Sequence, residues 1–130
     1  MATIVDTGVA GSADAIGSTL GTLGLNYNDV AHVILTHDHP DHAGSIDEVL
    51  AMAVNATAYA GEADLRGIRA EGLTGLLGGE DIFGLEVLAT PGHTAGHMSV
   101  IDHAAGLLVA GDAMWSQDGG VAEGPAQFFN

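Results

Sequence analysis

The stretch Val33–Ser45, VILTHDHPDHAGS, contains three histidines and two aspartates within six consecutive residues. The apolar run Val33–Leu35 leads directly into these polar residues. A short apolar, β-branched run followed by polar residues is typical of a buried strand that delivers a loop at its C-terminal end. Pro40 suits the first turn of a helix. The stretch therefore predicts a strand, a polar loop and a helix in succession.

The spacing of the polar residues is typical of metal ligands. Alternate side chains of an extended segment fall on one side, so His37 and His39 are expected to meet one ion, with Asp38 turned away from it. Asp41 and His42 follow where the chain turns and could serve a second ion. Imidazole and carboxylate together suit zinc, iron, manganese or cobalt. A polar loop with chance histidines is the alternative interpretation.

Thr36–Gly44 resembles the first metal motif of the metallo-β-lactamase-fold hydrolases. Two further stretches resemble family motifs: Gly92–Thr94 follows an expected strand at Leu85–Leu88, and Gly111–Asp112 follows one at Leu107–Ala110. The resemblance implies ligands for two ions: His37, His39 and His93 for the first, Asp41 and His42 for the second, and Asp112 as the bridge between them.

A further match lies near the N-terminus, where an expected strand at Ala2–Val5 ends in Asp6-Thr7-Gly8. By the resemblance, Asp6 orients a metal-bound histidine through the other nitrogen of its ring. A turn that merely ends the strand is the alternative. Three other histidines are given no metal role: His32 is expected at the surface, His97 at the start of the next strand, and His103 in an exposed hairpin turn.

The fold implied by the resemblance is α/β: the four-layer αββα sandwich of the metallo-β-lactamases, here incomplete. Family members have further strands before the Asp-Thr-Gly strand and continue through a helix and strand to one more histidine, whereas no histidine follows His103. Residues 1–130 are therefore expected to form a single partial domain that lacks edge strands, the C-terminal helix and strand, and the last ligand of the second site. Its exposed sheet edges could pair in a homodimer.

The connecting segments are expected to alternate helix and strand. Glycines are expected to leave Ala70–Glu80 as a mobile loop and Met114–Asn130 irregular. The remaining expected elements are a helix from about Ser12 through Leu20, a strand at Ala31–Leu35, a helix at Ser45–Val54, a strand at Thr57–Tyr59, a short helix at Glu62–Arg69 and a strand at Met98–Ile101.

The charge of the chain narrows the choice of partners. Among 130 residues there are 17 acids, no lysine and two arginines, Arg66 and Arg69, which gives a net charge of −15. Such a field repels nucleic acid and anionic membranes, and neither is expected as a partner. A very acidic, lysine-free composition favours adaptation to high salt, where self-repulsion is screened. An acidic mesophilic protein is the alternative.

The absence of cysteine excludes disulfides and thiolate zinc sites, so any metal ligands must be histidine and carboxylate. No apolar run approaches the length of about 20 residues that a membrane span needs. No basic segment followed by an apolar one opens the chain, so no signal peptide is visible and a cytoplasmic location is expected.

The expected function is that of a metal-dependent hydrolase acting on a small molecule, most similar to glyoxalase-II-like and lactonase-like family members. One or two zinc ions, with iron or manganese as alternatives, would carry a hydroxide that attacks an ester, thioester, lactone or amide carbonyl. Asp41 would act as a catalytic residue by orienting this nucleophile. The alternatives are a metal-binding fragment without turnover and a di-iron redox protein. The redox members usually carry a glutamate where His39 stands.

Overall fold

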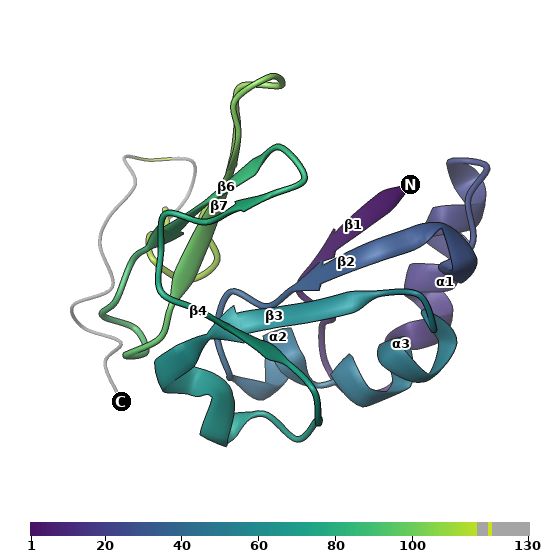
Figure 1. Cartoon of the computed structure of the whole chain (residues 1–130), viewed down its shortest axis with the longest axis horizontal. Coiled ribbons are helices and arrows are strands. Elements are labelled where there is room, and N and C mark those ends of the chain that lie inside the picture. Colours follow the sequence, from purple (N-terminus) through teal and green to yellow (C-terminus); the bar gives the residue numbers. More distant parts are fainter. Residues whose placement is uncertain (117–119, 121–130) are drawn as a thin grey trace.

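The computed structural model describes residues 1–116 and 120, whose elements are shown in Figure 1. The helices are α1 (Ala13–Thr22), α2 (Pro40–Ala43) and α3 (Ile46–Met52), with 3₁₀ helices η1 (Tyr27–Asp29) and η2 (Glu62–Gly67). The strands are β1 (Ala2–Val5), β2 (Val30–Ile34), β3 (Thr57–Gly61), β4 (Thr74–Leu76), β5 (Asp81–Ile82), β6 (Leu85–Ala89), β7 (Met98–Asp102) and β8 (Leu107–Val109).

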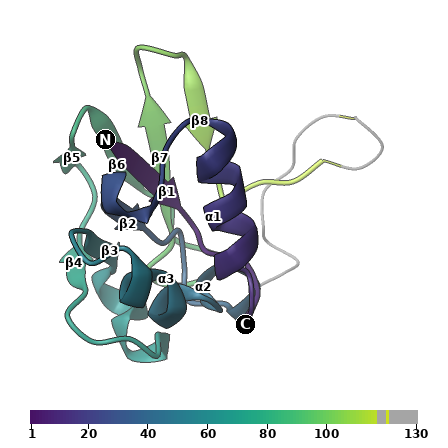
Figure 2. The same cartoon turned by 90° about the vertical axis from the view of Figure 1, so that its right-hand side faces the viewer.

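The strands form two sheets of different kinds. The first has the order β1-β2-β3-β4 and is parallel throughout, and the second has the order β5-β6-β7-β8 and is antiparallel. Parallel strands need crossover connections, which here pass through the helices. In Figure 1, α1 and α3 lie on one side of β1, β2 and β3, while β6 and β7 lie on the other. In the view of Figure 2 the β7–β8 hairpin projects at the top.

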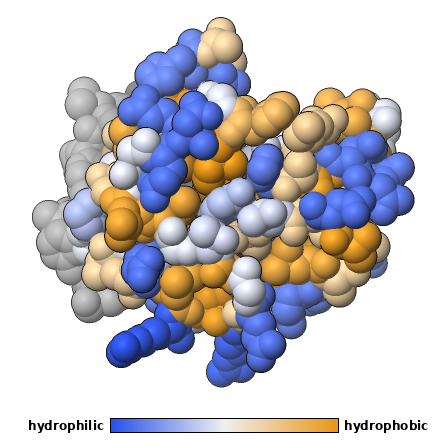
Figure 3. Space-filling model, viewed as in Figure 1, coloured by the Kyte–Doolittle hydropathy of each residue, from blue (hydrophilic) through white to orange (hydrophobic). Residues whose placement is uncertain are grey.

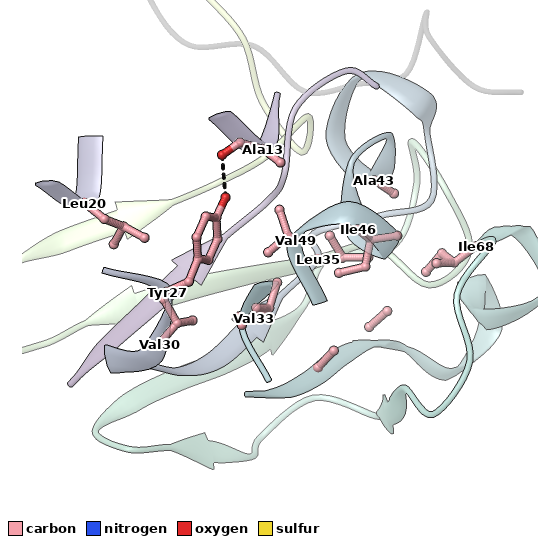
Figure 4. Close-up of a cluster of buried hydrophobic side chains, with 13 residues drawn as sticks. Ala13, Leu20, Tyr27, Val30, Val33, Leu35, Ala43, Ile46, Val49 and Ile68 are labelled. Atoms are coloured by element: carbon pink, nitrogen blue, oxygen red, sulfur yellow. Dashed lines mark hydrogen bonds between the residues drawn. The ribbon is translucent and has the colours of Figure 1, made fainter. Parts of the chain in front are cut away.

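Both faces of the first sheet are covered. Successive residues of β2 point to opposite faces, and a buried core lies against each face. Val33 and the following Leu35 enter the core beneath the helices, which Figure 4 shows in close-up. Ile34 enters a second core between the sheets, together with Val87 and Val100. This pattern explains why Val33–Leu35, at the end of β2, is a continuous apolar run rather than an alternating one.

These layers are helices, a parallel sheet and an antiparallel sheet. In the described part of the chain, no helix covers the outer face of the second sheet. Three of the four αββα layers are thus present, and the predicted α/β class and incomplete sandwich are confirmed.

The expected end of α1 has a clear physical cause. Gly24 adopts φ +72°, and the amide of Leu25 donates to the carbonyl of Leu20 at 2.9 Å. This is the pattern with which a left-handed glycine closes a helix. The predicted strands of both sheets are present within one or two residues. The predicted helix Ser45–Val54 is shorter, as α3, and the predicted helix at Glu62–Arg69 is the 3₁₀ helix η2.

The prediction of a mobile loop at Ala70–Glu80 is wrong. Three of its residues form β4, in which Thr74 pairs with Tyr59 of β3. The Glu80 carboxylate also accepts hydrogen bonds from the amides of Leu77 and Gly78, each at 2.7 Å, and these bonds lower the pKa of Glu80. Sheet pairing and this side-chain bond therefore outweigh the flexibility that the glycines suggested.

Hydrophobic and hydrophilic residues are interspersed on the face shown in Figure 3. The sheet edges are β1 and β4 in one sheet and β5 and β8 in the other, and dimerisation through them stays a prediction. Within the described residues, no helix is long and apolar enough to cross a membrane. Most of the segment predicted to be irregular, residues 117–119 and 121–130, lies outside the described residues.

Candidate metal centre

Three loops meet at the C-terminal end of β2. The first follows β2 and enters α2, the second connects β6 to β7, and the third follows β8. The amide of Met98 donates to the carbonyl of Thr36 at 2.8 Å, which ties the start of β7 in the second sheet to the loop after β2 in the first. Residues distant in sequence are thereby held at one edge of the sandwich.

The structure brings His37, His39, His93 and Asp112 together, with one potential ligand atom from each lying within 4.8 Å of the others. We call this group the three-histidine cluster. His93 Nε2 lies 2.9 Å from His39 Nδ1 and 3.1 Å from Asp112 Oδ2. His37 Nε2 lies 3.5 Å from the same carboxylate oxygen. A tetrahedral zinc site with bonds of 2.0–2.1 Å has its ligand atoms about 3.3 Å apart, so the spacing fits.

The hydrogen bonding of His37 supports the same interpretation. Its ring is fully buried, and Nδ1 lies 2.9 Å from Thr36 Oγ1, whereas the buried Nε2 has no hydrogen-bond partner. A buried polar atom without a partner costs about 1–3 kcal/mol, and a cation at this point would remove that cost. The residues present therefore fit a bound metal ion.

A second group shares Asp112 with the first. Asp41, His42 and Asp112 have ligand atoms within 4.8 Å of one another, and we call them the aspartate cluster. His42 Nε2 lies 3.3 Å from Asp112 Oδ1 and 3.6 Å from Asp41 Oδ2. The side chain of Asp41 is 65% exposed. The two oxygens of Asp112 thus face different clusters, as a bridging carboxylate would require.

Asp6 contacts His42 directly and His37 through the hydroxyl of Thr36. One of its oxygens accepts from the Thr36 amide at 2.7 Å, and the other lies 2.8 Å from both Thr36 Oγ1 and His42 Nδ1. Asp6 has φ +63°, which is rare for a residue other than glycine. Strained backbone persists where surrounding contacts enforce it, and such positions are concentrated at functional sites. The contact with His42 agrees with the predicted role of Asp6, and that role stays a prediction.

The pKa values of His37 and His42 are shifted in opposite directions. Burial, followed by the neighbouring His42 and His97, lowers the pKa of His37 to about 4. The hydrogen bond to Asp6 is the main cause that raises the pKa of His42. At neutral pH, His37 is consequently neutral and able to bind a metal, whereas a proton competes more strongly for His42.

Close backbone packing explains why Gly44 ends the motif. A Cβ at Gly44 would lie 2.5 Å from the amide nitrogen of Ala10 and 2.8 Å from the carbonyl carbon of Val9. Only glycine lets the end of α2 approach the loop after β1 this closely. That approach places His42 near Asp6.

Asp64 holds the loop that carries His93, and the sequence analysis did not identify it. It is 3% exposed and accepts hydrogen bonds from Thr94 Oγ1 at 2.6 Å and from the Gly96 amide at 2.8 Å. These contacts span about 30 residues, so no local spacing signals them. Within η2, Glu62 is a second acid, so nothing in the local sequence singles out Asp64.

The histidines without a predicted metal role have different surroundings. His103 is exposed, as predicted, and its Nε2 lies 2.6 Å from Glu86 Oε2. His32 was expected at the surface but is half-buried, with its ring near those of Tyr59 and Phe83. His97 is fully buried and lies outside both clusters. Asp38 is also outside them: its side chain lies against Gly67.

One hollow borders each cluster. One, of about 780 Å³, is lined by His39 and His93, and the other, of about 830 Å³, is lined by Asp41 and Arg69. Both are within the usual size range of small-molecule sites. Each cluster thus borders a hollow of small-molecule size.

Comparison with known proteins identifies the family. Residues 2–129 match the model of the metallo-beta-lactamase superfamily. The chain is 33% identical over 143 residues to the uncharacterized protein YobT of Bacillus subtilis, covering 92% of this chain and 60% of that protein. It is 35% identical over 101 residues to a hydroxyacylglutathione hydrolase of Erwinia tasmaniensis, covering 73% of this chain and 38% of the hydrolase.

The fold agrees with solved structures. The metallo-beta-lactamase family protein TTHA1429 of Thermus thermophilus superposes with a TM-score of 0.73 at 25% identity, covering 87% of this chain and 51% of that protein. Across these three proteins, this chain spans between 38% and 60% of the relative's own length. The chain belongs to the metallo-beta-lactamase superfamily.

Proposed function

We propose that this chain forms the metal centre of a hydrolase that cleaves an ester, thioester, lactone or amide bond in a small molecule. The observation that carries the proposal is the convergence of three imidazoles and one carboxylate around the unpartnered Nε2 of buried His37. The hydroxyacylglutathione hydrolase relative supports the choice of an acyl substrate. Zinc, in one or two ions, is the metal that this donor set suits best.

Each residue has a role that follows from its position. His37, His39 and His93 would hold the first ion, and the two oxygens of Asp112 would reach both sites. Asp6 would hold His42 through Nδ1 and leave Nε2 for the second ion. When bound, zinc lowers the pKa of a coordinated water to about 7 and polarises a carbonyl.

Asp41 is the proposed catalytic residue. Its carboxylate is exposed and faces the hollow that also contains Arg69. An acceptor at this place can fix the orientation of an attacking water and take its proton.

Metal binding without turnover is the second candidate. The described part of the aspartate cluster contains three ligand residues, Asp41, His42 and Asp112, and one of them is shared. Such a cluster would hold its ion less tightly than the three-histidine cluster. A chain with only the first site filled would bind zinc but hydrolyse poorly.

Hydrolysis assays separate these candidates. Purified protein is freed of metal, loaded with zinc, and tested on matched ester, thioester, lactone and amide substrates beside the metal-free form. Hydrolysis that requires zinc and is lost in Asp41→Asn supports the hydrolase. Bound zinc without any turnover supports the second candidate, and no bound zinc contradicts both.

A further inference from the structure

His97 is the last residue of the loop that carries His93, although it belongs to neither cluster. Its ring is fully buried and stacks on that of His37, with the centroids 4.9 Å apart and the planes at 29°. Its Nε2 lies 3.1 Å from the amide nitrogen of Asp112. A backbone N–H can only donate, so Nε2 must accept.

This contact determines the position of the ring proton. A neutral imidazole has one acceptor and one donor nitrogen, so Nδ1 of His97 carries the hydrogen. Nδ1 lies 2.9 Å from Thr90 Oγ1 and donates to it. Thr90 Oγ1 then donates to Ser99 Oγ at 2.8 Å, and Ser99 donates to the carbonyl of Ala110 at 3.3 Å.

The chain of hydrogen bonds therefore starts and ends on the same loop. Its first donor is the amide of Asp112, and its last acceptor is the carbonyl of Ala110 two residues earlier. Each hydrogen bond in this chain has a defined donor and acceptor, and each hydrogen has an acceptor. Such a closed set of bonds fixes the backbone more firmly than a single contact would.

Gly111 supplies independent support. It lies between the two ends of the chain, with φ +56°. A Cβ at this position would lie 2.8 Å from His97 Nε2 and 2.9 Å from Thr36 Cβ. The loop after β8 thus passes directly over the edge of the His97 ring, and glycine is needed for that approach.

We propose that His97 is a positioning residue whose Nε2 fixes the backbone of Asp112, and so directs the Asp112 carboxylate between the three-histidine cluster and the aspartate cluster. The inference rests on the proposed metal site, but the hydrogen-bond chain exists without metal. His97 touches neither ion in this account. Its effect on metal binding passes through Asp112.

Substitutions at His97 separate positioning from packing. His97→Phe keeps an aromatic ring against His37 but has no acceptor, whereas His97→Gln loses the ring and can keep an acceptor. Positioning predicts that His97→Phe weakens zinc binding at the aspartate cluster about 10- to 100-fold and that His97→Gln recovers part of it. Packing predicts the reverse order. If His97→Phe does not fold, Thr90→Val can replace it, because this variant removes the hydroxyl that accepts the hydrogen of His97 Nδ1. His103→Phe, at an exposed histidine, is the control.

The measurements are zinc titration, the visible spectrum of the cobalt-substituted protein, and nitrogen-15 NMR of the metal-free protein. Long-range histidine spectra should show His97 with its proton on Nδ1, and the Asp112 amide should change most in His97→Phe. A proton on Nε2, or unchanged zinc binding in His97→Phe, would overturn the inference. If the wild type binds no zinc, the proposed function fails, and the NMR result alone decides the role of His97.

Discussion

The two clusters share Asp112 but differ in what surrounds them. The three-histidine cluster includes a fully buried ring, and its loops are tied together by buried hydrogen bonds. The aspartate cluster has an exposed carboxylate, Asp41, and its histidine is held by a single side chain, Asp6. Burial and the bonds between its loops should make the first cluster a strong, preorganised site and the second a weak one that depends on the bridge.

The largest expected effect comes from His37→Ala, which removes the one fully buried ligand of the three-histidine cluster. Zinc affinity of that cluster should fall by more than about 100-fold, because two histidines and a carboxylate remain without their buried support. Metal content measured by mass spectrometry after dialysis tests this. His103→Ala, an exposed histidine, is the control and should retain wild-type zinc. Equal zinc in both variants would show that the cluster is not a metal site.

Asp112→Ala probes the bridge itself. It should lower the zinc content of both clusters and any hydrolysis together, because Asp41 and His42 alone cannot hold an ion. Asp38→Ala is the matched control: it removes another acid of the same loops, but one whose side chain lies against Gly67. Its zinc content should be nearly unchanged. A similar loss in the two variants would mean that the second cluster is misassigned.

Acid should empty the two clusters in sequence. The pKa of His42 is raised, chiefly by Asp6, so protons compete for it at a higher pH than for His37, whose pKa is lowered to about 4. Because zinc needs deprotonated imidazole, the aspartate cluster should release its ion first as the pH falls. Bound zinc followed against pH should show two steps. A single step would remove the distinction between the clusters.

The metal-free protein provides a check on the sign of the His37 shift. The pKa of His37 in the folded protein lies below the unfolded value of about 6.5, so folding disfavours protonation of this ring. The corresponding stability is present above pH 6.5 and is lost progressively towards pH 4. Chemical denaturation at several pH values should show this loss in the wild type and a smaller one in His37→Phe.

Much of the candidate site could be predicted from the sequence, because several of its ligands lie close together in the chain. The ligand residues follow strands, and β2 is apolar on both faces, so motif and strand together predict the edge where His37 and His39 lie. The resemblance supplied His93 and Asp112. For His37 and His39, by contrast, the spacing within one short stretch was enough to indicate metal ligands.

The supporting residues were not predictable because their partners are far away in sequence. Asp64 bonds to residues about 30 positions later, and His97 bonds to an amide 15 positions later. The strand β4 was missed for a related reason. Its three residues include Gly75, and only pairing with β3 shows that they are extended.

Asp64→Ala should weaken only the three-histidine cluster, because Asp64 holds the loop of His93 and has no contact with the aspartate cluster. Removing the carboxylate leaves the Gly96 amide buried without an acceptor, which should cost about 1–3 kcal/mol of unfolding free energy. Asp14→Ala, an exposed acid of α1, should change stability by no more than about 0.5 kcal/mol. Denaturant unfolding and zinc titration test both. Loss of zinc from the aspartate cluster alone would contradict this assignment.

Salt should have the smallest effect, and it should act differently on the two clusters. With a net charge of −15 and only two arginines, the acidic side chains on the surface repel one another. Salt screens this repulsion, with a screening length of about 10 Å at 0.1 M and about 3 Å at 1 M. The melting temperature of the metal-free protein should therefore rise with sodium chloride.

Bound zinc at the exposed aspartate cluster neutralises some of the same acids, so its stabilising effect should shrink as salt increases. Zinc at the three-histidine cluster would lie against the buried ring of His37, so its stabilising effect should change less with salt. Melting curves of wild type and Asp41→Asn, with and without zinc, across a salt series separate these contributions. A melting temperature that is flat or falls with salt would remove the argument for adaptation to high salt and leave the composition as that of an acidic mesophilic protein.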